Sequence, residues 1–424
     1  MQLDADWLKA QGDDAMLLFS VNGQFFLKKQ KVIAVAVSGG GDSMALLHLA
    51  HRVAEQAGVP VHAVTVDHGL RPESASEAQA VAAFCESINV PHETLVWKND
   101  GVSGNLSAAA RDARYRMIAA WAKRKKIGHI LLGHTQDDYA ENFLMALSRS
   151  AGVDGLSAMD TQFERSGVTF ARPLWQTSRA ELRDYLTRFG IDWVDDPTND
   201  DDRYLRTRVR KALPVLDALG ITQEKLCEVG LNARITRSAL DHQMHQDAQE
   251  FVTQDRGDLI IQNFYGQKIL HFEIERRLTR RMVQWINFEP YPPRQSSLTE
   301  ATASLSTAGK ATIGGCVLTR EKNISWRITR EFQAVRGTVC ATDAVWDGRW
   351  QLDGPHAPDL QIRALGDGIH DCPNWRETGM PRVSLLASPA VWRNDTLISA
   401  PLAGYNDEWS ARIVADFHSY LLAH

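Results

Sequence analysis

A glycine-rich turn between an apolar segment and an amphipathic segment is the feature that most constrains the fold of this chain. Residues 38–43 have the sequence Ser-Gly-Gly-Gly-Asp-Ser; they follow the apolar residues 32–37 and precede the helix-like residues 44–57. Glycines let a backbone approach phosphate oxygens closely, and the free N–H groups at a helix start favour an anion. The order of strand, turn and helix therefore predicts a phosphate-binding loop formed by Ser38, Gly39, Gly40, Gly41, Asp42 and Ser43.

The same alternation continues through the first half of the chain. Residues 61–66, 93–97 and 127–133 have the apolar pattern of buried strands, and residues 74–87 and 108–125 have the pattern of helices. Strands that alternate with helices at this spacing predict an α/β fold with a doubly wound parallel sheet. Ligands of such sheets bind at the carboxyl ends of the strands, which is where the glycine-rich turn lies.

The pattern changes in the second half. Helical periodicity at residues 226–250 and 273–288 predicts a mostly helical unit. Further on, short strand-like runs such as residues 397–400 precede a predicted amphipathic helix at 409–422. We therefore expect three domains: a catalytic α/β domain at 1–217, a helical domain at 218–330 and a small α+β domain at 331–424.

Composition excludes several classes of function. A net charge of -5 over 424 residues argues against a protein that coats nucleic acid by bulk charge, so such a partner needs local basic patches. No run approaches the roughly 20 apolar residues that cross a bilayer, and residues 1–20 carry scattered aspartates, unlike a signal peptide. The five cysteines contain no C-x-x-C pair, which argues against zinc or iron-sulfur binding by paired thiolates. We expect a cytoplasmic protein that does not bind membranes.

Asp42 is the informative residue of the loop. A carboxylate among phosphate-binding amides repels its ligand unless a cation lies between them, so we expect Asp42 to orient magnesium on a triphosphate. A Walker A loop is excluded because no lysine stands at its required position, and a dinucleotide fingerprint is excluded because Met44 replaces its third glycine. Asp67, at the end of the second strand, is the one feature that still suits a dinucleotide. A glycine turn without any ligand is the plainer alternative.

The loop resembles the S-G-G-x-D-S signature of the PP-loop ATP pyrophosphatases, which split ATP between the α and β phosphates. Four further stretches resemble the tRNA(Ile)-lysidine synthetase family in order and spacing. They are residues 66–71 (V-D-H-G-L-R), 110–115 (A-R-D-A-R-Y), 133–142 (G-H-T-Q-D-D-Y-A-E-N) with 149–156, and 172–174 (R-P-L) continuing through 195–199 to 206–210. Departures from the family pattern are His134-Thr135 in place of H-H, Glu141-Asn142 in place of E-T, and residues 149–152 in place of R-G-x-G.

This resemblance implies a reaction and its partners. The wobble cytidine of an isoleucine tRNA with a CAU anticodon is adenylated by ATP with magnesium, and free lysine then displaces AMP to give lysidine. The helical and C-terminal domains would bind and recognise the tRNA. The protein would be a monomer or a dimer. A PP-loop tRNA thiolase or another adenylating enzyme is the alternative, although thiolases generally carry paired or catalytic cysteines. A nucleotide-binding regulatory module without turnover is a further alternative.

Two acidic residues are candidates for the lysine step. Lysine attacks only as the neutral amine, so carboxylates must bind its cation and then accept a proton. Asp138 and Glu141 are spaced i, i+3 and are expected on one helical face, with Asp137 rotated away as a helix-start charge. Either residue of the pair could instead complete a magnesium site with Asp42, and a solvated acidic helix start is the alternative.

Arginines complete the predicted site. Arg111 and Arg114 are expected to bind ATP together with Asp67 and the loop, or else to be surface residues that face Asp112 or solvent. On a helix, three further arginines would form one stripe for tRNA phosphates: Arg203, Arg206 and Arg210. The acidic residues 195–202 could instead make that segment a salt-bridged corner. Arg208 lies off the stripe and is expected to face the active site as a catalytic residue.

Overall fold

The computed structural model describes residues 10–25, 31–69, 73–98, 106–157, 159–195, 201–262, 264–265, 268–289, 291–321, 325–406 and 408–423. The chain divides into two compact units, Met1–Arg237 (unit 1) and Ser238–His424 (unit 2). The expected boundary between residues 330 and 331 falls inside unit 2. Leu70, Arg71 and residues 196–199 of the sequence motifs lie outside the described residues.

Unit 1 is built on a mixed sheet. Among its described residues six strands lie in the order β3-β2-β1-β4-β6-β5, with all neighbours parallel except the hairpin of β5 and β6. This confirms the predicted parallel α/β sheet and adds an antiparallel edge. The strands are β1 (Ile33–Ala36), β2 (Val61–Asp67), β3 (His92–Val96), β4 (His129–Leu132), β5 (Gln162–Arg165) and β6 (Val168–Ala171).

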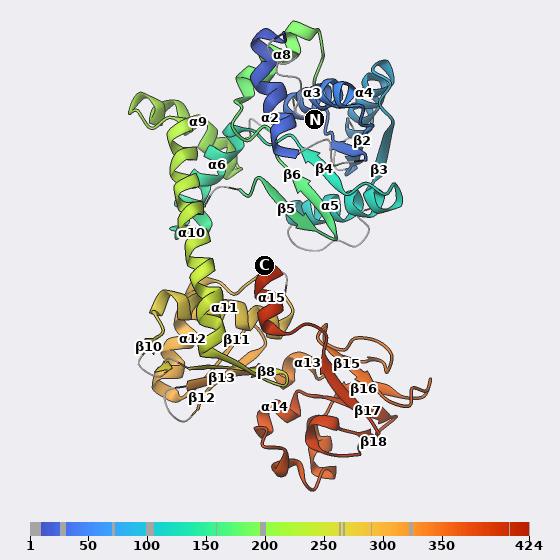
Figure 1. Ribbon diagram of the computed structural model, residues 1–424, viewed down its shortest axis with the longest axis vertical. Helices are drawn as coiled ribbons and strands as arrows, with labels where there is room; N and C mark the ends of the chain where they lie inside the picture. Colours follow the sequence, from blue (N-terminus) through green and yellow to red (C-terminus); the bar gives the residue numbers. More distant parts are fainter. Residues whose placement is uncertain are drawn as a thin grey trace. The chain divides into compact units, whose positions relative to one another are not determined.

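Helices cover both faces of this sheet (Figure 1). Successive residues of β1 point to opposite faces, so Val35 packs in one core and Ala34 in the other. The first core also takes side chains from η1–α2 (Gly12–Asp14, Ala15–Phe25), α3 (Gly41–Ala57), α4 (Ser74–Ser87) and α8 (Arg179–Phe189). The second is closed by Tyr115 and Trp121 of α5 (Leu106–Arg124).

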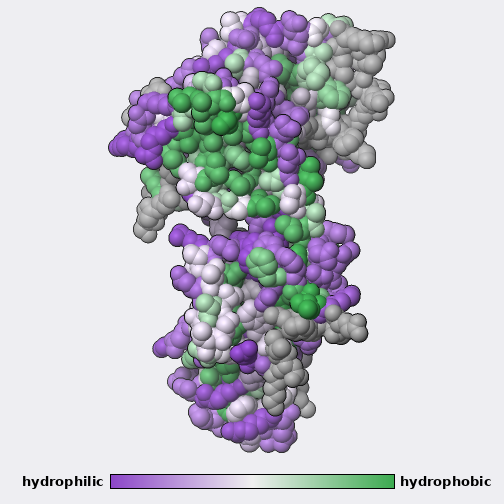
Figure 2. All heavy atoms as spheres, turned by 90° about the vertical axis from the view of Figure 1, so that its left-hand side faces the viewer, coloured by the Kyte–Doolittle hydropathy of each residue, from purple (hydrophilic) through white to green (hydrophobic). Residues whose placement is uncertain are grey.

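A smaller helical layer completes unit 1. It contains α6 (Gln136–Leu147), α7 (Val153–Leu156), α9 (Leu205–Ala218) and the start of α10 (Gln223–Phe251). Tyr139 of α6 packs there with Leu213 and Leu226. Apolar side chains of α9 and α10 also reach the surface, among them Val215 and Val229, and Figure 2 shows such side chains gathered on that face. The apolar stripes of α9 and α10 therefore extend beyond the core that they form with α6.

Unit 2 contains an antiparallel sheet that the sequence patterns did not predict. Its order is β11-β12-β13-β8-β7, and α11, α12 and α15 pack on it, with Phe417 of α15 fully buried in the shared core. Prediction of a mostly helical segment at 218–330 was therefore incomplete, because these strands are short and lie between the helices. The elements are β7 (Val252–Asp255), β8 (Asp258–Gln262), β9 (Phe264–Tyr265), β10 (Lys268–Ile269), α11 (Phe272–Asn287), α12 (Gln295–Ala308), β11 (Lys310–Ile313), β12 (Cys316–Arg320) and β13 (Ser325–Arg330).

The rest of unit 2 is an α+β arrangement around a sheet of order β14-β16-β17-β18. The expected helix at 409–422 was wrong in its first half: residues 410–413 form a strand against β15, and the helix begins only at Phe417. None of the helices in the described ranges is long and apolar enough to span a membrane. The elements are α13 (Phe332–Val335), β14 (Cys340–Ala341), β15 (Trp350–Asp353), β16 (Gln361–Ala364), η4 (Gly366–Asp371), η5 (Trp375–Thr378), α14 (Arg382–Leu386), β17 (Pro389–Arg393), β18 (Thr396–Ser399), η6 (Pro401–Ala403), β19 (Ser410–Ile413) and α15 (Phe417–Ala423).

Candidate active site

The glycine-rich loop joins β1 to α3 as predicted. Gly39 has a φ of 86°, a conformation that side chains disfavour, and its carbonyl accepts a hydrogen bond from the Val194 N–H at 2.9 Å. Ser43 Oγ donates to the Gly40 carbonyl at 2.9 Å and accepts from the Ser38 N–H at 3.1 Å. These bonds hold the loop in shape and leave the first turn of α3, with its helix-start N–H groups, at the carboxyl edge of the sheet.

Asp42 lies in that first turn. Burial raises its pKa to about 6, although the guanidinium of Arg179 opposes the shift. Arg179 Nε donates to Asp42 Oδ2 at 3.1 Å. A partly buried carboxylate beside a phosphate loop is thus already paired with a cation in this structure, as expected from its charge.

The strand β4 leads to the acidic helix. Thr135 caps α6, and its N–H and hydroxyl donate to Asp138 Oδ2 at 3.0 and 3.2 Å. The second oxygen, Asp138 Oδ1, accepts from Arg179 Nη2 at 3.2 Å. Burial alone opposes ionisation of Asp138, but Arg179 and these N-terminal contacts hold its pKa below the ordinary value. One carboxylate oxygen of Asp138 therefore caps the start of α6, and the other contacts Arg179 in the site.

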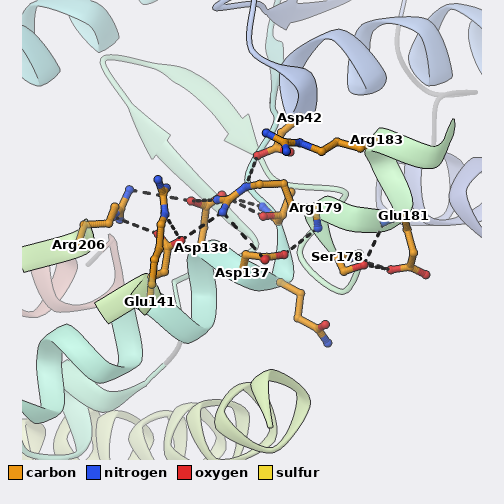
Figure 3. A network of polar contacts seen from close by, with 12 residues as sticks. Asp42, Asp137, Asp138, Glu141, Ser178, Arg179, Glu181, Arg183 and Arg206 are labelled. Carbon is orange, nitrogen blue, oxygen red and sulfur yellow. Dashed lines mark hydrogen bonds and ion pairs between the residues drawn. The ribbon is translucent and has the colours of Figure 1, made fainter. Parts of the chain in front are cut away.

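Glu141 is fully buried one turn further along α6. Its carboxylate accepts from Arg179 Nη1 at 3.2 Å and from Arg210 Nε at 2.6 Å, and Arg206 Nε lies 3.3 Å from Oε2. Figure 3 shows the Arg179 guanidinium between Asp42 and the α6 carboxylates. Asp138 and Glu141 thus share a face, as predicted, and Arg179 joins both to the phosphate loop.

Asp137 is not isolated from this network, contrary to expectation. Its Oδ2 accepts the backbone N–H of Arg179 at 2.7 Å, at the first residue of α8. Asp137 therefore lies in the first turn of α6, as expected, and also accepts a hydrogen bond from the first residue of α8. The reason is that α8 begins beside α6, which spacing along one helix does not reveal.

Sequence reasoning missed Arg179, the residue with the most contacts to the acidic group. A signal was present: Ser178 and Glu181 form a capping box, with Ser178 Oγ accepting from the Glu181 N–H at 3.2 Å, so a helix start could be placed there. An arginine at the first position of a helix faces the positive end of the dipole and needs nearby anions. Those anions come from α3 and α6.

The predicted stripe of three arginines does not form. Arg203 precedes α9, is 85% exposed, and pairs with Asp201, whereas Arg206 and Arg210 on α9 point to Glu141. The alternative of an ion-paired corner is nearer the structure. However, the carboxylate that pairs with Arg206 and Arg210 is Glu141 of α6, and not one from the acidic residues before α9. Arg208 is exposed on α9, and among the described residues it makes no ion pair with Asp42, Asp137, Asp138 or Glu141.

Residues at the ends of β2 and β4 form a second part of the site. Asp67 Oδ1 accepts a hydrogen bond from the Gly69 N–H at 2.8 Å. Burial lowers the pKa of the neighbouring His68, and the positive charge of Arg114 on α5 lowers it further. Burial likewise lowers the pKa of the Arg114 guanidinium. Asp112 pairs with Arg165 at 2.8 Å rather than with Arg111 or Arg114, so the Asp112 pairing in the alternative was wrong. Arg111 is nevertheless exposed on α5, as the alternative of a solvent-facing arginine predicted, whereas Arg114 is only partly exposed.

His134 is held neutral beside Asp138. Burial lowers its pKa to about 3, and its Nδ1 accepts a hydrogen bond from Arg172 Nε at 3.1 Å. The acceptor role at Nδ1 places the ring proton on Nε2. The Arg172-Pro173-Leu174 motif therefore fixes the orientation of this histidine.

Comparisons with known proteins agree with this geometry. A PP-loop domain family matches residues 15–216. The tRNA(Ile)-lysidine synthase of Ruegeria pomeroyi is 42% identical over 413 residues, which cover 96% of this chain and 98% of that protein. The chain belongs to the tRNA(Ile)-lysidine synthase family.

The chain is also similar to a second curated protein and, more weakly, to a solved structure. The tRNA(Ile)-lysidine synthase of Rhodopseudomonas palustris is 39% identical and covers 66% of this chain and 82% of that protein. A solved U34-tRNA thiolase from Methanococcus maripaludis has 16% identity and a TM-score of 0.46, covering 52% of this chain and 77% of the thiolase. Identity along nearly the whole chain favours the tRNA(Ile)-lysidine synthase interpretation over the thiolase alternative, and the PP-loop domain supports ATP as the nucleotide.

Proposed function

We propose that this enzyme ligates free lysine to the 2-carbon of the wobble cytidine in isoleucine tRNA with a CAU anticodon, with AMP and pyrophosphate as products. The observation that carries the proposal is the single network in which Arg179 links Asp42 of the phosphate loop to Asp138 and Glu141 of α6. ATP activation and amine binding need these two kinds of group within one site. We also propose a cytoplasmic location, which suits a tRNA substrate.

In the first step the cytidine 2-oxygen attacks the α-phosphorus, a phosphorus-oxygen bond forms, and the bond to pyrophosphate breaks. The helix-start amides of α3 and the arginines near β2 are suited to hold the phosphates, with Arg111 and Arg114 as proposed contacts. Asp67 keeps the turn after β2 in place through the Gly69 N–H. Trp193 packs against Gly41, and the Val194 N–H donates to the Gly39 carbonyl, so this segment supports the loop.

Asp42 is the carboxylate that we propose for magnesium. Magnesium commonly takes one or two protein carboxylates and shares its remaining ligands with phosphates and water. Asp42 lies in the first turn of α3, at the phosphate loop, which suits such a site. Magnesium supplies positive charge to the phosphate oxygens when it is bound with ATP.

In the second step the lysine ε-nitrogen attacks the cytidine 2-carbon, the carbon-oxygen bond to AMP breaks, and the amine loses protons to carboxylates. The side chain of Asp138 is 10% exposed and directs one oxygen toward the site, whereas the side chain of Glu141 is fully buried. We therefore assign the contact with the amine to Asp138. Glu141 holds Arg179, Arg206 and Arg210 in position.

The tRNA contacts are proposed from exposure. Arg203 and Arg208 have exposed side chains on the segment that leads into and along α9, and such guanidinium groups can pair with phosphates. Arg206 and Arg210 would act on the tRNA only indirectly, through Glu141. We propose that the second half of the chain, including residues 331–424, recognises the tRNA body.

Incorporation of labelled lysine into RNA tests this function. The full chain, ATP, magnesium and isoleucine tRNA with a CAU anticodon should give acid-precipitable label, and a methionine tRNA with the same anticodon should give little. A labelled sulfur donor tests the thiolase alternative in parallel. Sulfur incorporation without lysine incorporation would overturn the proposal.

A further inference from the structure

Arg179 occupies the position that the cations of the reaction need. Its three guanidinium nitrogens each contact a different carboxylate: Nε contacts Asp42, Nη1 contacts Glu141 and Nη2 contacts Asp138, at 3.1 to 3.2 Å. Under the proposed function, Asp42 serves magnesium and Asp138 serves the lysine amine. One protein cation therefore holds both carboxylates while neither substrate cation is bound.

The charges around Arg179 leave room for another cation. Four carboxylates (Asp42, Asp137, Asp138 and Glu141) lie among three guanidinium groups (Arg179, Arg206 and Arg210). Glu141 keeps Arg206 and Arg210 if Arg179 moves away. Within the described residues, Arg179 is the one cation in an ion pair with Asp42. Departure of Arg179 therefore exposes Asp42 in particular to a new cation.

The base of Arg179 is fixed while its end is accessible. Its backbone N–H is bound by Asp137, and the Ser178–Glu181 capping box holds the start of α8. The side chain is 23% exposed and has several rotatable bonds, so the guanidinium can change partners without movement of the helix. Figure 3 shows it reaching from α8 between α3 and α6.

We propose that Arg179 exchanges its carboxylate partners for phosphate oxygens when the nucleotide binds. In the free enzyme it holds the carboxylates in place. ATP with its metal brings both a cation that takes Asp42 and anionic oxygens that accept the guanidinium N–H groups. No covalent bond is made or broken in this exchange. The inference rests on the proposed role of Asp42, and Arg179 is neither a metal ligand nor a proton carrier in it.

The exchange predicts opposite effects of one substitution on two ligands. In Arg179→Gln the competitor at Asp42 is gone, so Mn²⁺ without ATP should bind roughly ten-fold more tightly than to the wild type. The same variant lacks the phosphate partner, so ATP with magnesium should bind roughly ten-fold more weakly. A purely structural role for Arg179 predicts that both ligands bind more weakly.

Paramagnetic titration of MnCl2 and calorimetry of ATP with magnesium measure the two affinities on the full chain, without tRNA or lysine. Arg188→Gln is the matched control: it lies on the same helix, pairs with Asp14, and leaves Asp14 its second partner Arg52. Its affinities should equal those of the wild type. Adding Asp42→Asn to Arg179→Gln should abolish the gain in Mn²⁺ affinity.

Arg179→Lys keeps the test valid if the glutamine variant does not fold. One ammonium cannot span three carboxylates, so Mn²⁺ affinity should rise by a smaller factor, roughly three-fold, and ATP affinity should fall less. Unchanged or weaker Mn²⁺ binding in both variants would overturn the inference, as would normal ATP binding. Because neither assay contains tRNA or lysine, failure of lysine incorporation would refute the proposed function separately.

Discussion

Gly133 lies against the backbone of Asp42 so closely that a Cβ atom at Gly133 would come within 2.9 Å of the Asp42 carbonyl oxygen. The same Cβ would be 3.0 Å from the Ser43 Cα atom. Gly133 follows β4, which leads to α6, and Asp42 lies in the first turn of α3, so the lack of a side chain at Gly133 lets the phosphate loop approach the end of β4. Both halves of the proposed reaction depend on that distance.

Gly133→Ala should therefore push the phosphate loop away from β4. Backbone atoms cannot rotate aside as a flexible side chain can, so we expect a loss of about 1 to 3 kcal/mol in stability and a clear loss of ATP affinity. Gly128, before β4, has no atoms within 4 Å of its Cβ position. Gly128→Ala should bind ATP normally. Equal ATP affinity of the two variants, measured by calorimetry, would contradict this role of Gly133.

Asp42→Asn should abolish the magnesium-dependent first step. The variant keeps the size of the side chain and removes its charge beside the phosphates, so pyrophosphate release should fall by about 100-fold or more. Asp184→Asn, at an exposed position of α8, is the control and should release pyrophosphate at the wild-type rate. Wild-type release from Asp42→Asn, with an unchanged melting temperature, is the result that would remove Asp42 from the mechanism.

The two acidic residues of α6 should differ from their neighbour. Asp138→Asn and Glu141→Gln should each reduce turnover at saturating lysine by roughly 30-fold to several hundred-fold, equivalent to about 2 to 4 kcal/mol. Asp137→Asn should cost little, because its amide oxygen can still accept the Arg179 backbone N–H. Glu141→Gln should also lower the melting temperature, since it leaves three arginines with one carboxylate fewer. Similar losses in all three variants would refute the assignment.

His48 should make the stability of unit 1 depend on pH. Burial lowers its pKa to about 4, with Arg52 and His51 adding to the shift, and its Nδ1 lies 2.8 Å from the Tyr185 hydroxyl. The unfolded chain takes up this proton first, at about pH 6.5, so stability falls as pH decreases from there toward 4.

In His48→Gln the free energy of unfolding should fall by about 1 to 2 kcal/mol less between pH 7.5 and pH 5 than in the wild type; this value is reduced to allow for the exposed part of the ring. Asp42, with its raised pKa, acts in the opposite direction between pH 6 and 3.8, but it is present in both proteins and cancels in the difference. Chemical denaturation at pH 7.5 and pH 5 gives the measurement, with the exposed His242→Gln as control. Parallel acid losses in wild type and His48→Gln would show that His48 is not the group responsible.

Local patterns were sufficient to predict the frame of unit 1. The expected helix at residues 74–87 coincides with α4, and the expected strand at 61–66 with β2, because alternating burial and helical periodicity are properties of adjacent residues. The glycine-rich loop was predicted for the same reason.

Long-range contacts were not accessible in this way. Arg179 meets Asp42 from 137 residues away and Asp138 from 41 residues away, so its role depends on where α8 packs. The arginine stripe failed for a related reason: Arg203 lies before α9, and Glu141 of another helix attracts Arg206 and Arg210. The sequence indicated the phosphate loop and the acidic residues of α6, but neither the part of Arg179 nor the pairing of the charges.

Adenylation followed by discharge tests the central claim most directly. The full chain is mixed with isoleucine tRNA bearing a CAU anticodon and with ATP labelled at the α-phosphate, first without lysine and then with it. We predict that labelled AMP becomes attached to the tRNA in the absence of lysine, and that added lysine releases one AMP for each lysine incorporated. A tRNA that never carries the label, or a label that lysine does not release, would contradict the account.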